Sequence, residues 1–306
     1  MADSFCFITG AHVDMTGRLF AAPVPGASNP GQVTARAGGA GLNSASTAAA
    51  LGADVVIASP VGDDAQGENL RRTLAARGIG DALVLLEGAR TGTYTTIIAP
   101  DGSMVIGLAD LAIYEAVGAQ WFFDHCGAAL DKADIWFVNA NLPAATLSAL
   151  AARAGGRQIA AATISPAKAQ RLAVILARTR FLFTNVGEAR ALTGLAQAQA
   201  PRLVEALIAA GVPSGTISAG PGPLSWWHDG QTGTLLPPPV KTVIDVNGAG
   251  DALAATVLVA LTRGHDFKHA ARLGIAAAQL TLGSPEPYCP QLDWHRLEYA
   301  AAAITA

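Results

Sequence analysis

The sequence predicts an α/β domain in which helices cover both faces of a mostly parallel central sheet, with a small β-sheet lid beside it. Three observations lead to this fold class. Short apolar runs alternate with amphipathic ones through most of the chain, as strands alternate with helices. Two segments lack helical periodicity and contain paired extended runs around turns. Polar residues and glycines recur where the apolar runs end, which is where open parallel sheets bind ligands.

The composition fits one large domain, which we expect to cover residues 1–306. Hydrophobic residues make up 51% of the 306-residue chain and charged residues only 14%, which is ample for a buried core. A net charge of −3 argues against nucleic acid or an anionic membrane as a partner. The longest apolar run is too short to span a bilayer, and the first residues do not resemble a signal peptide. The spacing of the three cysteines fits neither a metal site nor a disulfide framework, so we expect reduced thiols and a cytoplasmic protein. These cysteines are Cys6, Cys126 and Cys289.

The elements follow in chain order. We expect strands at 5–8, 55–58, 135–138, 158–162, 181–183, 215–218 and 240–244. We expect helices at 44–51, 64–77, 144–153, 167–176, 186–192, 201–210, 253–261 and 268–280. Two extended pairs, at 17–22 with 32–37 and at 93–99 with 104–108, are separated by turns rich in proline, glycine, asparagine and aspartate. They predict a lid made from about residues 15–37 and 91–109.

The segment 245–251 carries the strongest chemical signal. Its two glycines, Gly248 and Gly250, are expected between a strand and an apolar helix, where unpaired N–H groups and the helix dipole favour an anion. Asp251 lies in the first helical turn and faces the same place. A carboxylate beside an anion site suits a base that takes the proton from a hydroxyl attacking a bound phosphate. A plain helix start, with Asp favoured by the dipole, explains the segment equally well.

Other polar groups allow two interpretations each. Gly38 and Gly39 precede a helix that carries Asn43, which suits close approach of a polyhydroxyl ligand, although an N-cap explains Asn43 alone. Asn185 and Glu188 lie three apart at a helix start. They suit a water-mediated Mg²⁺ site, and a capping pair is an equal alternative. Further candidates follow predicted strands: Asp14, Asn139 and Asn141, and the loop Gly220-Pro221-Gly222.

Several site types are excluded or disfavoured. The chain has no G-x-x-x-x-G-K-[ST] motif, which excludes a P-loop nucleotide-binding enzyme. No G-x-G-x-x-G follows the first strand, which disfavours a nicotinamide-dependent oxidoreductase. His265 and His269 lie four apart without an evident third ligand, so we interpret them as surface histidines.

Taken together, the motifs resemble those of the PfkB, or ribokinase-like, carbohydrate kinases. Residues 38–43 with Ala45, Leu51 and Gly52 resemble the first signature of that family, and residues 245–251 resemble the second. Asn185 and Glu188 between them match its N-x-x-E motif. The motifs occur in the same order over nearly the whole chain. The resemblance implies a ribokinase-like three-layer sandwich with a β-sheet lid, and ATP-dependent phosphorylation of a primary alcohol.

The resemblance also implies roles for individual residues. Asp251 is expected to be the base, and the amides of Gly248, Ala249 and Gly250 to form the anion hole. Sugar hydroxyls and the rest of the acceptor are expected at Asp14, Gly38, Gly39, Asn43, Asn139 and Lys168. ATP is expected at Asn185, Ser218, Gly220, Gly222, Gly248 and Gly250. Glu188 and Asn185 are expected to organise Mg²⁺ through water, and Asp245 to lie near a monovalent cation such as K⁺.

Within the family, the chain is most similar to the pseudouridine kinase group. Residues 28–31, Thr93-Tyr94, 109–111 and Ser165-x-x-Lys168 carry this similarity. Four places depart from the pattern: Leu42 in place of Arg, Ala162-Thr163 in place of Asp-Pro, Asn247 in place of Thr, and residues 287–290. From this similarity we expect phosphorylation of the 5′-hydroxyl of a ribosyl compound. Pseudouridine is the first candidate for that compound.

The sequence leaves alternatives to this reading. Ribose, another nucleoside or a keto-sugar could be the acceptor, or the chain could be a non-catalytic nucleoside- or sugar-binding protein on the same scaffold. The apolar lid residues Ile97, Ile98, Val105 and Ile106 suggest a homodimer through the lid, although core packing explains them equally well.

Overall fold

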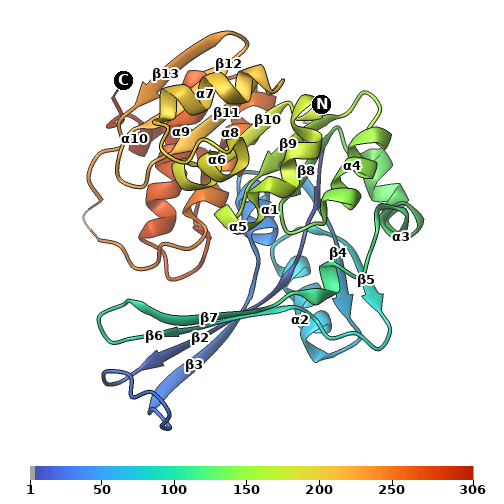
Figure 1. Cartoon of the computed structure of the whole chain (residues 1–306), viewed down its shortest axis with the longest axis vertical. Helices are drawn as coiled ribbons and strands as arrows, with labels where there is room; N and C mark the ends of the chain where they lie inside the picture. The colour runs from blue at the N-terminus through green and yellow to red at the C-terminus, as the bar shows by residue number, and fades with distance from the viewer. Residues whose placement is uncertain (1–3, 241, 306) are drawn as a thin grey trace.

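A computed structural model of the chain describes residues 4–240 and 242–305. Helices lie on both sides of a nine-stranded central sheet, and a four-stranded sheet projects from one end of it (Figure 1). The predicted fold class is therefore confirmed. No helix within the described residues is long and apolar enough to cross a membrane.

The central sheet has the order β13-β12-β11-β10-β9-β8-β1-β4-β5. The strands from β5 to β11 in that order run parallel, and β12 and β13 add an antiparallel edge. Their bounds are β1 Ser4–Ile8, β4 Asp54–Gly62, β5 Gly80–Leu86, β8 Ile135–Asn139, β9 Gln158–Ala162, β10 Phe181–Asn185, β11 Ser214–Ser218, β12 Leu224–His228 and β13 Gln231–Leu235.

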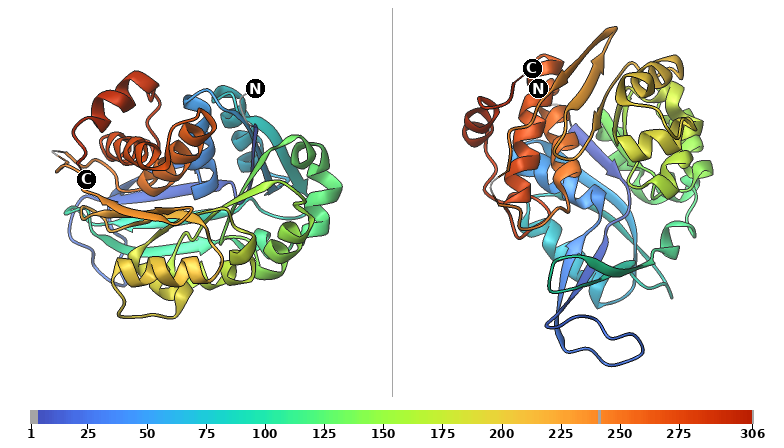
Figure 2. Two further views of the ribbon diagram at one scale, coloured as in Figure 1. Left: turned by 90° about the horizontal axis from the view of Figure 1, so that it is seen from above. Right: turned by 60° about the vertical axis from the view of Figure 1, so that its left-hand side comes forward.

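Two hydrophobic cores lie on opposite faces of this sheet. In β1, Phe5 and Phe7 enter one core while Cys6 and Ile8 enter the other, because successive strand residues face opposite sides. Figure 2 shows the two helical layers on either side of the sheet. One layer contains α1 Ala40–Ala50, α2 Ala65–Ala76, α8 Ala249–Thr262, α9 Phe267–Leu282 and α10 Trp294–Ala301. The other contains α3 Ala119–Lys132, α4 Ala144–Arg153, α5 Pro166–Ala169, the 3-10 helix η2 Gln170–Arg178, α6 Val186–Thr193 and α7 Ala200–Ala209.

The small sheet has the order β3-β2-β6-β7. Its strands are β2 His12–Leu19, β3 Gly31–Gly38, β6 Thr93–Ile98 and β7 Met104–Asp110, and the short 3-10 helix η1 Ala112–Tyr114 follows β7. Only three residues lie between the end of β1 and the start of β2, so the sheet is joined directly to the centre of the domain. We call this sheet the lid. Asp14 lies within β2, opposite Arg36 of β3 and Tyr94 of β6, and not in a loop after a strand as the sequence suggested.

Two sequence predictions of local structure are wrong. Residues 240–244 form no strand in the part that the structure describes, with Lys241 outside it. Ile244 N–H instead donates to the Leu282 carbonyl oxygen at the end of α9 (2.8 Å), so this run packs against a helix end. The single helix expected at 167–176 is a short α5 followed by the 3-10 helix η2.

Candidate active site

The N-terminus of α8 opens onto a cavity. Gly248 is its N-cap at a φ of 80°, and the first helical bond runs from Ala252 N–H to the Gly248 carbonyl oxygen (2.8 Å). The N–H groups between them therefore have no partner within the helix. A Cβ on Gly248 would lie 1.8 Å from the Pro287 carbonyl oxygen, whereas a Cβ on Gly250 would meet nothing within 4 Å. The turn is thus closed by protein at Gly248 and open to a ligand at Gly250.

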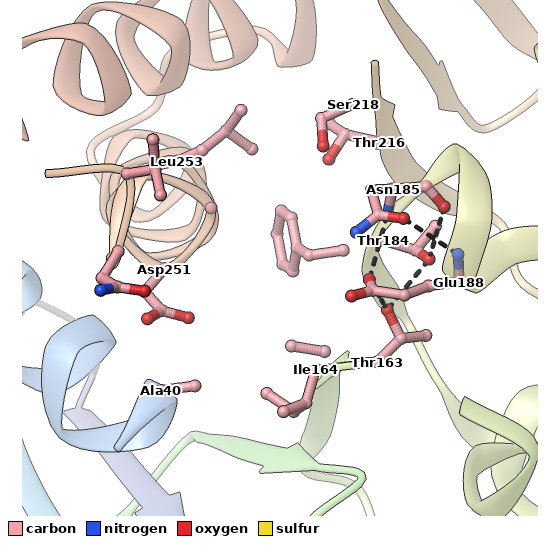
Figure 3. Close-up of a pocket in the computed structure, with 16 residues that line it drawn as sticks. Ala40, Thr163, Ile164, Thr184, Asn185, Glu188, Thr216, Ser218, Asp251 and Leu253 are labelled. Atoms are coloured by element: carbon pink, nitrogen blue, oxygen red, sulfur yellow. Dashed lines mark hydrogen bonds between the residues drawn. The ribbon is translucent and has the colours of Figure 1, made fainter. Parts of the chain in front are cut away.

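Asp251 lies one residue beyond this opening and faces the cavity (Figure 3). Asn43 Nδ2 donates to its Oδ2 at 2.9 Å. Burial raises the pKa of Asp251 to about 7; the Asn43 hydrogen bond opposes that rise, and the negative charges of Asp14 and Glu188 add to it. A carboxyl group with this pKa can both accept and release a proton near neutral pH.

The cavity has a volume of about 250 Å³ and lies where α1, α8 and the ends of β9, β10 and β11 meet. Figure 3 shows Ala40 and Asp251 on one side of it and Thr163, Glu188 and Asn185 on the other, with Thr216 and Ser218 at one end. The cavity brings together six of the residues predicted from the sequence: Asn185, Glu188, Ser218, Gly248, Gly250 and Asp251.

Asn185 and Glu188 form a complete capping box at the start of α6. The Asn185 side chain accepts from Glu188 N–H (2.9 Å), and Glu188 Oε2 accepts from Asn185 N–H (3.2 Å) and from Thr163 Oγ1. The capping interpretation of this pair is therefore confirmed. Both residues also line the cavity, and Figure 3 shows the Glu188 carboxylate pointing toward it. The cap fixes the two side chains and leaves oxygen atoms facing the open space.

A second glycine segment places Asn43 beside Asp251. Gly38 leaves no room for a side chain, because a Cβ there would lie 2.0 Å from Asp14 Oδ2. Gly39, the N-cap of α1, has a φ of 99°. Asn43 is buried, and its Oδ1 has no hydrogen-bond partner among the residues that the structure describes. A buried acceptor without a partner costs free energy unless a ligand completes it, so Asn43 Oδ1 can accept a hydrogen bond from a ligand hydroxyl beside Asp251.

The remaining predicted residues do not line the cavity. Asn139 is fully buried and donates to Thr9 Oγ1. Lys168 Nζ donates to Asn141 Oδ1 at 2.7 Å, and burial, with the nearby Arg171 charge, lowers the pKa of Lys168. Asp14 Oδ1 lies 3.2 Å from His12 Nε2 at the base of the lid. Gly220 and Gly222 lie in the exposed turn after β11, and Asp245 Oδ1 accepts from Asn247 N–H at 3.0 Å.

Sequence reasoning missed several cavity residues at the strand ends. Thr163 Oγ1 lies 3.0 Å from Thr184 Oγ1 and can accept from it, which links the ends of β9 and β10 beside Glu188. Thr216 is buried and lines the cavity, and its Oγ1 has no partner within residues 4–240 and 242–305. Threonine is common in strands, so its type carried no signal. Position did carry one, because Thr163 and Thr184 lie at carboxyl ends of parallel strands.

The histidine pair lies outside this site. Glu298 of α10 supplies the third group that the sequence did not reveal, since its oxygen and the nitrogens of His265 and His269 all lie within 4.8 Å of one another. His269 Nε2 lies 3.2 Å from Glu298 Oε1. The three side chains are half-buried or exposed and none lines the cavity. The expectation of surface histidines agrees with this placement, and the nearby third group, Glu298, was not evident from the sequence.

Known proteins share this fold and sequence pattern. The model of the pfkB family of carbohydrate kinases matches residues 13–293. A carbohydrate kinase from Agrobacterium tumefaciens is 34% identical and superposes with a TM-score of 0.87, covering 99% of this chain and 98% of its own. The uncharacterized sugar kinase YeiI of Escherichia coli K12 is 28% identical over 94% of this chain and 81% of its own. Pseudouridine kinase of the same organism is 26% identical over 95% of this chain and 94% of its own.

The family match covers all of the residues that line the cavity, and it includes both glycine segments and the capping box. Proteins of this family are sugar or nucleoside kinases, and they transfer a phosphoryl group to a hydroxyl. The chain belongs to the pfkB family of carbohydrate kinases.

Proposed function

We propose that this protein transfers the γ-phosphoryl group of ATP to the 5′-hydroxyl of a ribosyl compound, and that pseudouridine is its preferred acceptor. The observation that carries the proposal is the position of Asp251. Its carboxyl group, with a pKa raised to about 7, faces the same cavity as the open N-terminus of α8 at Gly250. A proton acceptor and an anion site side by side are what in-line phosphoryl transfer needs.

In the proposed reaction, Asp251 takes the proton of the acceptor hydroxyl while the oxygen of that hydroxyl bonds to the γ-phosphorus. The bond from that phosphorus to the β,γ-bridging oxygen breaks, and ADP leaves. The amides of Gly248, Ala249 and Gly250 are proposed to donate to the transferred phosphoryl oxygens, whose charge the α8 dipole also stabilises. The open space at Gly250 supports this role, because a phosphate can approach the backbone there without a steric clash.

We place the acceptor beside the lid. The unpartnered Oδ1 of the buried Asn43 supports a hydroxyl contact there. Asp14 adjoins Gly38 at the base of the lid and is proposed to accept from a second hydroxyl. Gly39 would allow a close backbone contact. Asn139 and Lys168 remain proposed acceptor contacts, and they would have to exchange their present hydrogen bonds to Thr9 and Asn141.

We place ATP at the opposite end of the cavity, where Thr216 and Ser218 lie (Figure 3). Asn185, Ser218, Gly220 and Gly222 are the proposed nucleotide contacts. Carboxylate and amide oxygens are the ligands that Mg²⁺ prefers, and it usually keeps several waters, so Glu188 and Asn185 fit a water-mediated site. The bound ion would offset the charge of the phosphates. Asp245, whose Oδ1 adjoins Asn247 N–H, is proposed near a monovalent cation such as K⁺.

Replacing Glu188 with glutamine should separate the charge of this residue from its structural role. Gln preserves a capping box, so the melting temperature of Glu188→Gln should stay close to that of the wild type. Loss of the carboxylate charge should raise the Mg²⁺ concentration for half-maximal turnover by about tenfold, equivalent to ~1.4 kcal/mol. Turnover measured across a Mg²⁺ titration checks this. An unchanged Mg²⁺ dependence in a folded variant would remove Glu188 from the proposed metal site.

A panel of acceptors tests the proposed function directly. Purified protein is mixed with ATP and Mg²⁺ and with pseudouridine, uridine, adenosine, ribose or a fructose derivative, and phosphorylated product is measured. We expect the highest kcat/KM for pseudouridine, in line with the similarity to the Escherichia coli enzyme over nearly its whole length. A higher value for another acceptor would replace the substrate and keep the mechanism. Ligand-induced thermal shifts without turnover on any of them would favour a non-catalytic binding protein.

We also propose that a second copy of the chain covers the lid. Strand β7 is exposed along its whole length and carries the apolar side chains of Met104, Val105, Ile106 and Leu108. These residues lie on an edge strand outside both cores, so core packing does not account for them. Sedimentation of wild type and Ile106→Glu tests this, since a monomeric wild type would contradict it.

A cytoplasmic location remains part of the proposal, in keeping with three buried, unpaired cysteines.

A further inference from the structure

The chain adopts a rare backbone conformation at Ile164, two residues after β9. Its φ is 72°, in the left-handed region that β-branched residues avoid. Ser165 N–H donates to the Thr163 carbonyl oxygen at 2.9 Å. A hydrogen bond across three residues, with a positive φ at the middle one, is the strained form of the γ-turn. Asp229 is the only other non-glycine residue with positive φ in the described chain, and Asp tolerates this conformation.

Contacts on both sides hold this turn in place. Thr163 Oγ1 donates to Glu188 Oε2, and Thr163 N–H donates to the Phe183 carbonyl oxygen at 3.3 Å. On the other side, the Ser165 carbonyl oxygen accepts from Ala169 N–H at 2.9 Å as α5 begins. A strained residue persists only where its surroundings determine the conformation, and such residues gather at active sites. The turn at Ile164 meets both conditions.

The conformation places an apolar side chain on the cavity wall. Ile164 lines the cavity and packs against both hydrophobic cores. In Figure 3, Ile164 lies across the cavity from Ala40 and Asp251, and at the end away from Ser218. Ala40 is the first residue of α1, the helix that carries Asn43. Ile164 therefore faces the end of the cavity that we assign to the acceptor, and not the end assigned to ATP.

We propose that Ile164 is a specificity-determining residue, whose strained turn holds an apolar wall that limits the bulk of the acceptor facing Asp251. This inference rests on the proposed function, since it needs an acceptor at that end. Glycine or asparagine would relieve the strain, yet the chain has a β-branched residue there. The side chain itself is thus what the turn presents to the ligand. A wall of this kind discriminates by size, because a bulkier acceptor must displace it.

Two variants separate the strain from the wall. Both Ile164→Ala and Ile164→Gly remove the wall, but only glycine adopts a φ of 72° without strain. We therefore expect Ile164→Gly to melt at a higher temperature than Ile164→Ala, the reverse of the order found at ordinary positions. Both variants should raise the ratio of kcat/KM for adenosine over pseudouridine by about tenfold, with KM for ATP unchanged. Ile175→Ala, which removes a buried side chain outside the cavity, should leave that ratio unchanged.

The outcomes distinguish this inference from the proposed function. An unchanged ratio in both Ile164 variants, or an equal rise in Ile175→Ala, would overturn the inference while leaving the kinase mechanism intact. A melting temperature for Ile164→Ala at or above that of Ile164→Gly would contradict the claim that the backbone at this position is strained. If the wild type phosphorylates none of the acceptors, the proposed function fails. Thermal shifts induced by adenosine and pseudouridine then test the proposed wall at Ile164. Equal shifts in wild type and variants would refute the wall, and a larger adenosine shift in the variants would support it.

Discussion

Asp251→Asn is expected to lower kcat by about 10²–10⁴-fold, the range that a general base contributes. The amide has nearly the shape of the carboxylate and can still accept from Asn43 Nδ2, which now lies 2.9 Å from Asp251 Oδ2. It cannot accept the proton of the acceptor hydroxyl. The side chains proposed to hold ATP lie on β10, β11 and the loop after it, and the contacts proposed at Gly248 and Gly250 use backbone amides that the substitution keeps. Affinity for ATP, measured by calorimetry, should therefore remain close to that of the wild type.

Two outcomes would count against this assignment. Wild-type turnover in a folded Asp251→Asn variant would show that another group, or water, takes the proton. Loss of ATP binding together with turnover would show that Asp251 serves the nucleotide site and not the acceptor. Ser44→Ala is a suitable comparison, because Ser44 Oγ contacts the backbone oxygen of Asp251 (3.3 Å) and not its carboxylate. It should retain most of its turnover.

Gly250→Ala is expected to reduce kcat/KM by about 10²-fold, comparable to the loss of one donor from an anion hole, without loss of stability. A Cβ at this position would meet no atom beyond its own helical turn within 4 Å, and Gly250 lines the cavity, so we expect the methyl group to take up space proposed for the phosphoryl group. Gly248→Ala should instead reduce the stability of the fold. Its Cβ would lie 1.8 Å from the Pro287 carbonyl oxygen, and its φ of 80° disfavours alanine. The free energy of unfolding should fall by about 2 kcal/mol or more.

Kinetics and thermal unfolding of these two variants check the pair. Full activity in Gly250→Ala would show that no phosphate approaches the backbone there, and the anion hole would have to lie elsewhere. Equal melting temperatures for Gly248→Ala and the wild type would show that the loop carrying Pro287 yields readily. The contrast between the two glycines is the informative result, since both occur in one short motif.

The sequence predicted the fold class and the glycines that line the cavity because both depend on local patterns. Alternation of apolar runs indicates the layers, and glycines before an apolar helix indicate the proposed anion site at Gly248 and Gly250. The strand predicted at 240–244 failed because an apolar, β-branched run fits a helix end as well as a sheet. Here Ile244 bonds to Leu282 instead of to a neighbouring strand.

Long-range packing decided what the sequence did not reveal. Asn43 and Asp251 are 208 residues apart, and only the packing of α1 on α8 brings the amide to the carboxylate. Glu298 joins His269 in the same way, across 29 residues. The left-handed turn at Ile164 had no sequence signal at all, because isoleucine is among the residues least expected there. Its neighbours impose that conformation, and they are fixed by contacts to α6 and β10.

The dependence of turnover on pH tests the central claim most directly. With a pKa raised to about 7, Asp251 is protonated and inactive as a base below that value and charged above it. The kcat/KM of the wild type should therefore rise with increasing pH, and the midpoint of this rising limb of the pH profile should lie near 7. Asn43→Ala removes the hydrogen bond that lowers this pKa, so its limb should lie at higher pH. A limb near pH 4, where aspartate ordinarily titrates, or the same limb in both proteins, would contradict Asp251 as the base of phosphoryl transfer.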